Sequence, residues 1–135
     1  MTAHPHFDSR GLPAGYPFKP ADEITAADAR AALARGLLLV DVRTTEELAV
    51  ASVPGATHIP LHELDKRIDE LADHDGPIAF MCHHGVRSMK ATLMARALGK
   101  PQSMSVAGGI DAWSLAADST VPRYERDGAG FKVVK

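Results

Sequence analysis

One stretch of this chain, Ile78 to Ser88, limits its folds more than any other. It begins with the apolar run Ile78–Met81, which is typical of a buried strand, and continues into a polar loop that opens with the chain's only cysteine, Cys82. A helical pattern from Met89 to Leu98 follows this loop. Open α/β sheets bind their ligands where strands end and loops lead into helices. We therefore predict that Cys82 lies at a binding site at the carboxyl end of a strand in a parallel sheet.

The residues after Cys82 favour a reactive thiol over a buried structural one. Consecutive amides can form a concavity that binds an anion, and Gly85 can adopt the positive φ that such a curl requires. The N-terminus of the following helix and the guanidinium of Arg87 also favour negative charge. Together they would stabilise an exposed thiolate, which is the nucleophilic form of cysteine. The predicted substrate-binding loop consists of His83, His84, Gly85, Val86, Arg87 and Ser88.

Composition narrows the function classes. The 135 residues suffice for one domain, and 45% hydrophobic with 24% charged residues is ordinary for a globular protein. A net charge of −2 argues against a nucleic-acid partner, and no apolar run is long enough to cross a membrane. The N-terminal residues lack the apolar core of a signal peptide. A single cysteine excludes an internal disulfide, so we expect the reducing cytoplasm.

The rest of the chain alternates strands with helices, which predicts a parallel sheet covered by helices on both faces. The apolar spacing predicts one amphipathic helix over Leu61–Leu71. It also predicts that the helix after Cys82 buries a stripe of apolar residues. That stripe consists of Met89, Leu93, Met94 and Ala97. Further expected elements are a helix over Ala26–Arg35 with Thr25 as its N-cap, and strands over Leu37–Val42, Thr57–Ile59 and Gln102–Val106.

The boundaries follow from composition. Residues 1–21 are expected to form an extended arm whose aromatic residues, Tyr16 and Phe18, pack on the domain. Residues 22–122 form the predicted domain. Residues 123–135 are expected to form a C-terminal tail. The tail is expected to pass over the domain as a strap and to finish in a loose end. Asp41 and Arg43, at the end of a predicted strand, are interpreted as a structural ion pair that supports the site. The scattered histidines do not mark a metal site.

Four segments resemble the rhodanese (thiosulfate sulfurtransferase) family. The loop CHHGVRS resembles that family's active-site loop, and Asp41-Val42-Arg43 its Asp-Val-Arg signature. SVPGATHIPL and VAGGIDAW resemble two further signatures, in the same order along the chain. The resemblance covers about Ile24 to Trp113. It implies a three-layer α/β sandwich with a central parallel sheet of about five strands, and Cys82 as the catalytic residue.

The resemblance also implies a chemistry without a cofactor. Cys82 would take the outer sulfur of a small anionic donor such as thiosulfate, carry it as a persulfide, and pass it to cyanide, a thiol or a protein acceptor. Arg87, helped by a protonated His83 or His84, would attract the donor.

Two other functions stay open. In the first, the chain is a sulfur-relay or sensory module that acts with protein partners, and activity on thiosulfate is incidental. Phosphatase or arsenate reductase chemistry on a related fold is less favoured, because cell-cycle phosphatases have five residues between Cys and Arg. Here four residues, His83 to Val86, separate Cys82 from Arg87.

Overall fold

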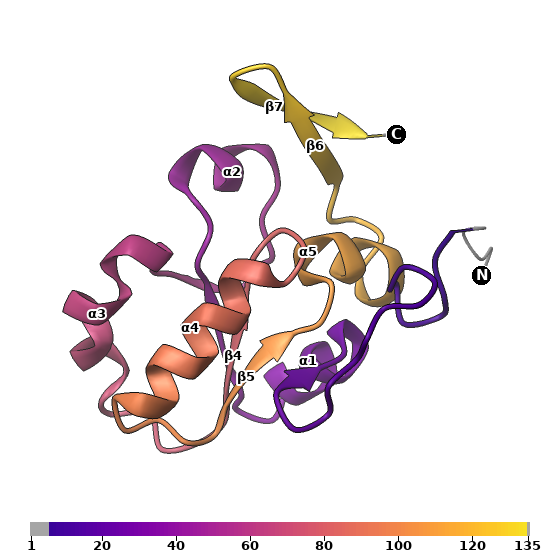
Figure 1. The fold of residues 1–135 in the computed structure, drawn as a ribbon. Helices are drawn as coiled ribbons and strands as arrows, with labels where there is room; N and C mark the ends of the chain where they lie inside the picture. Colours follow the sequence, from indigo (N-terminus) through magenta and orange to yellow (C-terminus); the bar gives the residue numbers. More distant parts are fainter. Residues whose placement is uncertain (1–5, 135) are drawn as a thin grey trace.

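The centre of the molecule is a parallel sheet with the strand order β1-β5-β4-β2-β3 (Figure 1). The structure, a computed structural model, describes residues 6–134, so residues 1–5 of the predicted arm and residue 135 of the predicted tail lie outside it. The strands are β1 Glu23–Ile24, β2 Leu38–Asp41, β3 Thr57–His58, β4 Ile78–Met81 and β5 Ser103–Val106. The predicted α/β sandwich around five strands is confirmed.

Alternating side chains along the strands build two cores, one under each helical layer. Leu39 and Met81 belong to the core beneath α1, Ala26–Leu33, and α5, Gly109–Ala112, which continues as the π-helical turn η3, Trp113–Ala117. Val40 and Phe80 face the other core, beneath α3, Leu64–Arg67, and α4, Val86–Ala97. α2, Thr45–Val50, lies beyond the carboxyl end of β2 (Figure 1). No helix among the described residues is long and apolar enough to cross a membrane.

The single helix predicted over Leu61–Leu71 is wrong, because the segment is broken into three short pieces. The 3-10 turns η1, Leu61–Glu63, and η2, Ile68–Leu71, flank α3. Short 3-10 turns commonly replace the ends of an α-helix. Apolar residues three or four positions apart face the sheet in an α-helix and in 3-10 turns alike. The spacing therefore located the apolar face but not the hydrogen-bond pattern.

The apolar stripe predicted for α4 is only partly right: Met94 packs against the core beneath the helix, but two other members of the stripe do not. Leu93 is 53% exposed and Ala97 is exposed, whereas the face toward the sheet consists of Ser88, Ala91, Thr92 and Ala95. These small side chains let the helix pack closely against β4 and β5. The hydroxyl of Thr92 is satisfied within the helix, because it donates to the Ser88 carbonyl at 2.8 Å. Available space, rather than hydrophobicity, therefore selects the buried face.

The described part of the N-terminal arm packs against the domain. Leu12 is fully buried, and its Cδ2 lies 2.7 Å from where a Cβ on Gly108 would be. Tyr16 and Phe18 pack against the core beneath α1, as predicted. The Tyr16 hydroxyl donates to the buried carboxylate of Glu23, and it lies 3.5 Å from a Cβ built on Gly85. The arm therefore covers one side of the loop that follows Cys82.

The loose end predicted for the C-terminal tail is wrong. Residues 123–134 form an antiparallel hairpin of β6, Arg123–Asp127, and β7, Gly130–Val134, next to α2 (Figure 1). Tyr124 is only 2% exposed and anchors the hairpin to the domain. The prolines and glycines of this segment suggested irregular chain, but Gly128, with φ +62°, instead serves the hairpin turn. The domain limits at residues 22 and 122 stay predictions.

Candidate active site

Cys82 follows β4 directly, in the loop that leads to α4, as predicted. Its side chain is not exposed, however: the residue is 1% accessible and belongs to the core beneath α4. Ser88, in the first turn of α4, lies beside the sulfur, and its hydroxyl contacts that of Ser105 in β5. A substrate must therefore reach the sulfur through the loop rather than across an open surface.

The contacts of the sulfur suit a thiolate. The amide of Gly85 donates to Cys82 Sγ at 3.0 Å, and this glycine, with φ +112°, is the N-cap of the long helix α4. The positive end of the helix dipole is thus directed at the sulfur. Ser88 Oγ lies 3.4 Å from Sγ and 2.7 Å from Ser105 Oγ. The two hydroxyls can reverse their direction of donation when the sulfur gains or loses charge.

The Gly-Gly segment holds the start of the loop from the other side of the sheet. The amides of Ile110 and Asp111 donate to the carbonyls of Cys82 and His83, at 2.8 and 3.2 Å. A Cβ on Gly109, which has φ +59°, would lie 2.4 Å from the Cys82 carbonyl oxygen. Only glycine permits both this conformation and this approach. The resemblance to the rhodanese Gly-Gly signature thus has a physical reason in this chain.

Replacing Gly109 with alanine should cost about 2 to 3 kcal/mol of stability and reduce activity, because strain and overlap both act on the loop carbonyls. The matched control is Gly128→Ala, at a similar φ of +62° but with open space around the new Cβ. That variant should cost about 1 kcal/mol and keep full activity. Urea unfolding and steady-state rates of both variants provide the measurement. Equal losses in the two variants would contradict the close approach.

Arg87 does not project as a free cation toward an anionic donor. Its two terminal nitrogens donate to the two carboxylate oxygens of Glu47, at 2.6 and 2.9 Å. Burial raises the pKa of Glu47, but the hydrogen bonds from Arg87 and Tyr124 outweigh this and bring the pKa down to about 2. Glu47 is therefore ionised at neutral pH. This partner from α2 neutralises the charge of Arg87 in the structure, and the predicted role of Arg87 in attracting donors stays a prediction.

A buried network connects this pair to the ion pair of Asp41 and Arg43. Arg43, fully buried, donates to Asp41 Oδ2 at 2.7 Å and to the Tyr124 hydroxyl at 3.1 Å. The Tyr124 hydroxyl in turn donates to Glu47 Oε2 at 2.6 Å. Burial and the bond to Glu47 raise the pKa of Tyr124, so the phenol stays protonated. Asp41 and Arg43 thus form the predicted ion pair.

The histidines of the loop differ from each other. His83 stacks on Tyr124, with 4.0 Å between ring centroids, and its Nε2 lies 3.0 Å from the Tyr124 carbonyl, to which it donates. Burial, and next the neighbouring His84, lower the pKa of His83 to about 4. His83 is therefore neutral near pH 7, and its predicted role in binding donors stays a prediction. His84 is exposed and stacks on His83 at 3.9 Å.

Three hollows surround the loop. The largest, of about 490 Å³, lies between the loop and the C-terminal hairpin. Two others, of about 410 and 320 Å³, lie toward the N-terminal arm, and His84 lines all three. Val86 is 69% exposed and lines the hollow of about 410 Å³. Among residues 6–134, no three His, Cys, Asp or Glu side chains are grouped to hold a metal ion.

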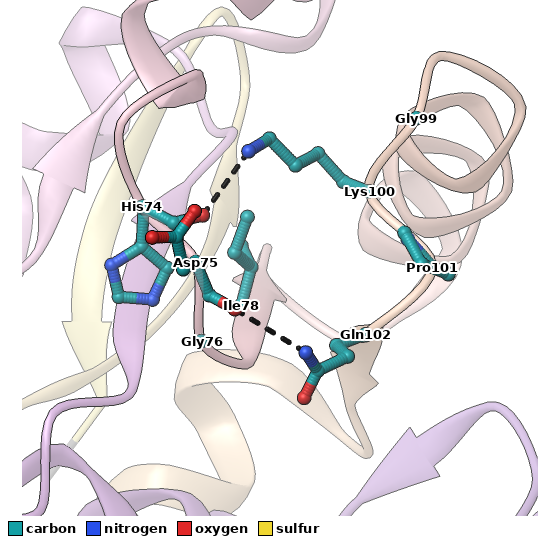
Figure 2. Close-up of a pocket in the computed structure, with 8 residues that line it drawn as sticks. All are labelled: His74, Asp75, Gly76, Ile78, Gly99, Lys100, Pro101 and Gln102. Carbon is teal, nitrogen blue, oxygen red and sulfur yellow. Dashed lines mark hydrogen bonds between the residues drawn. The ribbon is translucent and has the colours of Figure 1, made fainter.

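A fourth hollow, of about 220 Å³, lies at the opposite end of the sheet strands, where β4 and β5 begin (Figure 2). Its polar groups bind the chain itself. Lys100 Nζ donates to the His74 carbonyl at 3.1 Å, and Gln102 Nε2 donates to the Asp75 carbonyl at 3.3 Å. These bonds join two loops and leave the hollow without a reactive group. We do not regard it as a functional site.

Sequence reasoning missed four residues around the site: Glu47, Ser105, Tyr124 and Arg126. Glu47 carried a local signal, since a threonine followed three residues later by glutamate marks a capping box, and Thr44 and Glu47 form one. That signal explains the start of α2 but not the pair with Arg87. No local pattern marked the other three, because they approach the loop only through the fold.

The family model of the rhodanese-like domain matches residues 25–116. The chain belongs to this family. A thiosulfate sulfurtransferase, GlpE, of Haemophilus influenzae is 35% identical over 97 residues, which cover 72% of this chain and 91% of the relative. The human thiosulfate:glutathione sulfurtransferase is 31% identical over 107 residues, 69% of this chain and 93% of that protein. The family therefore supports sulfur transfer as the general class of activity.

A solved structure of a rhodanese-related protein from Thermoplasma volcanium also resembles this rhodanese-like chain. It has a TM-score of 0.62 and 33% sequence identity, and the match covers 68% of this chain and 89% of the other. The matched family segment ends at residue 116, before the C-terminal hairpin begins at Arg123. The hairpin thus lies outside the segment that the family model describes.

Proposed function

We propose that this rhodanese-like protein transfers sulfane sulfur through a persulfide on Cys82. The observation that carries the proposal is the position of Cys82 Sγ, 3.0 Å from the Gly85 amide at the N-terminus of α4. This contact stabilises the thiolate, and the same amide can bind the negative charge of a persulfide sulfur. A single cysteine, with no second thiol to form an internal disulfide, suits a reaction in the cytoplasm.

The reaction proceeds in two displacements. The Cys82 thiolate attacks the outer sulfur of thiosulfate; the S–S bond of the donor breaks, and sulfite leaves with the electron pair. A second nucleophile, such as cyanide or a thiol, then attacks the outer sulfur of the persulfide and releases the Cys82 thiolate. No oxidant, reductant or cofactor is needed, because the sulfur atom moves between nucleophiles.

The pairing of Arg87 supports sulfur over phosphoryl chemistry. An arginine that binds a phosphoryl group donates both terminal nitrogens to phosphate oxygens. In this chain both nitrogens donate to Glu47 instead. The four residues between Cys82 and Arg87 also leave a smaller loop than the five of the cell-cycle phosphatases.

Intact-protein mass spectrometry tests the proposal. Thiosulfate should add one sulfur atom, about 32 Da, to the wild-type protein, and cyanide should remove it. An untreated sample and a sample treated with sulfite alone are the controls. If no donor adds sulfur to Cys82 at any pH at which the protein is folded, the persulfide mechanism is wrong.

A further inference from the structure

A hollow lies between the loop that follows Cys82 and the C-terminal hairpin. Its volume of about 490 Å³ falls within the usual range for small-molecule sites. His83, His84 and Arg87 line it from the loop side, and Glu125, Arg126 and Phe131 line it from the hairpin. The hairpin thus contributes one wall of a cavity whose other wall is the loop of Cys82.

The charged groups of this cavity are paired, with one exception. Arg87 is neutralised by Glu47, and the carboxylate of Glu125 lies 3.5 Å from Lys132 Nζ. His83 is neutral near pH 7 because burial lowers its pKa to about 4. Among residues 6–134, Arg126 has no carboxylate within 4.0 Å of its guanidinium, which instead lies 5.2 Å from the ring centroid of Phe131. The arginine of the hairpin is therefore the cation that an anionic ligand would meet.

The position of Arg126 is fixed by its neighbours on the hairpin. Side chains two residues apart on a strand share a face, so Arg126 lies on the same face of β6 as Tyr124. Tyr124 is held by Glu47, by Arg43 and by the ring of His83. Phe131, the cross-strand partner of Arg126, packs edge-on against Tyr124 at 5.5 Å between ring centroids. The anchored hairpin therefore holds Arg126, an exposed residue, at the wall of the hollow that faces the loop.

We propose that Arg126 of the C-terminal hairpin binds the anionic group of the sulfur substrate in this cavity. The inference rests on the proposed function and assigns the charge recognition that Arg87 and His83 do not supply. For thiosulfate, the guanidinium would hold the sulfonate oxygens while the outer sulfur faces Cys82, and it would retain the sulfite as the S–S bond breaks. An organic thiol acceptor that carries carboxylates presents the same anionic chemistry.

Steady-state kinetics of Arg126→Gln test the proposal. With cyanide as a saturating acceptor, kcat/KM for thiosulfate should fall about 10- to 100-fold, the range for one lost charge-assisted hydrogen bond, chiefly through a higher KM. The difference from wild type should shrink as salt is added, because the contact is electrostatic and partly exposed. Circular dichroism and urea unfolding establish that the variant keeps its fold. An unchanged KM at low salt would overturn the proposal.

Three control variants sharpen this result. Arg126→Lys keeps the charge without the forked geometry and should recover part of the affinity. Glu125→Gln removes a negative charge from the same cavity, so the KM for thiosulfate should fall rather than rise. Lys66→Gln removes the positive charge of an exposed side chain on α3, outside the cavity, and should leave KM unchanged. An equal rise for Lys66→Gln would mean that net charge alone acts, which contradicts a site at Arg126.

Separate assays distinguish donor from acceptor. The acceptor step is measured at saturating thiosulfate with glutathione, which carries carboxylates, and with uncharged 2-mercaptoethanol. A loss confined to thiosulfate assigns Arg126 to the donor, and a loss confined to glutathione assigns it to the acceptor. No loss in either assay rejects the subsite.

Direct binding separates this inference from the proposed function. Calorimetric titration of thiosulfate into the unreactive Cys82→Ser protein requires no turnover, and the dissociation constant should rise about 10-fold or more when Arg126→Gln is added. An unchanged dissociation constant would reject the Arg126 site even if wild type forms the persulfide. Conversely, a wild type that binds thiosulfate through Arg126 but gains no sulfur would reject only the proposed chemistry.

Discussion

Cys82→Ser should reduce sulfur transfer at least about 1000-fold, because the thiolate is the only nucleophile that the proposed reaction uses. The serine hydroxyl stays protonated near neutral pH and does not attack sulfur. It can nevertheless accept from the Gly85 amide and donate to Ser88, as the thiol does. The rate of thiosulfate:cyanide turnover measures the loss of activity. The absence of the sulfur adduct of about 32 Da measures the loss of the persulfide.

The Cys82→Ser protein should still fold. Because the side chain is buried, the substitution should cost more stability than it would at an exposed position. Cys82 is 1% accessible, so we expect a cost of about 1 kcal/mol in urea unfolding. Ser105→Ala serves as the matched control. It removes a buried hydroxyl that is hydrogen-bonded to Ser88 and leaves the sulfur atom itself in place. Its turnover should fall far less. Wild-type turnover in Cys82→Ser would show that Cys82 is not the nucleophile.

Glu47→Ala should destabilise the protein by about 3 kcal/mol, at the lower end of the range for breaking a buried ion pair. The lost carboxylate accepts from both terminal nitrogens of Arg87 and from the Tyr124 hydroxyl, and it also completes the cap of α2. Arg87 is partly exposed, which lets water take over some of its hydrogen bonds. Urea unfolding at pH 7 measures the change in the free energy of unfolding.

The acid side of the stability profile tests the same residue. The folded pKa of Glu47 is about 2, below its ordinary value of 4.5, so its contribution to stability is complete above pH 4.5. That contribution should disappear as the pH falls from 4.5 toward 2 in wild type, and it should be absent at every pH in Glu47→Ala. The two unfolding curves should therefore converge at low pH.

The control for Glu47 is another glutamate that pairs with an arginine. Glu70 accepts from Arg67 at 2.7 Å, but it is half exposed, so Glu70→Ala should destabilise the protein far less than Glu47→Ala. Equal costs for the two variants would mean that burial of the Glu47 network adds nothing to stability.

The sequence located the strand, the loop and the helix around Cys82 because these depend on neighbours along the chain, although α4 begins at Val86 rather than at the predicted Met89. The apolar run Ile78–Met81 is β4 to the residue, and the glycine needed for the curl takes the predicted positive φ at Gly85. The N-cap at Thr25 and the capping box at Thr44 are likewise contacts within four residues. Local spacing can encode such contacts.

Only the tertiary structure decided how the charges around the sulfur are used. Glu47 and Arg87 are 40 residues apart, and Glu47 and Tyr124 are 77 apart. Whether Arg87 meets a carboxylate or a substrate depends on where α2 and the hairpin pack, and no periodicity specifies that. The same holds for the burial that keeps His83 neutral and for the face that α4 turns to the sheet. Desolvation and close packing arise only when distant segments meet, so the sequence located the nucleophile while the fold set its electrostatic surroundings.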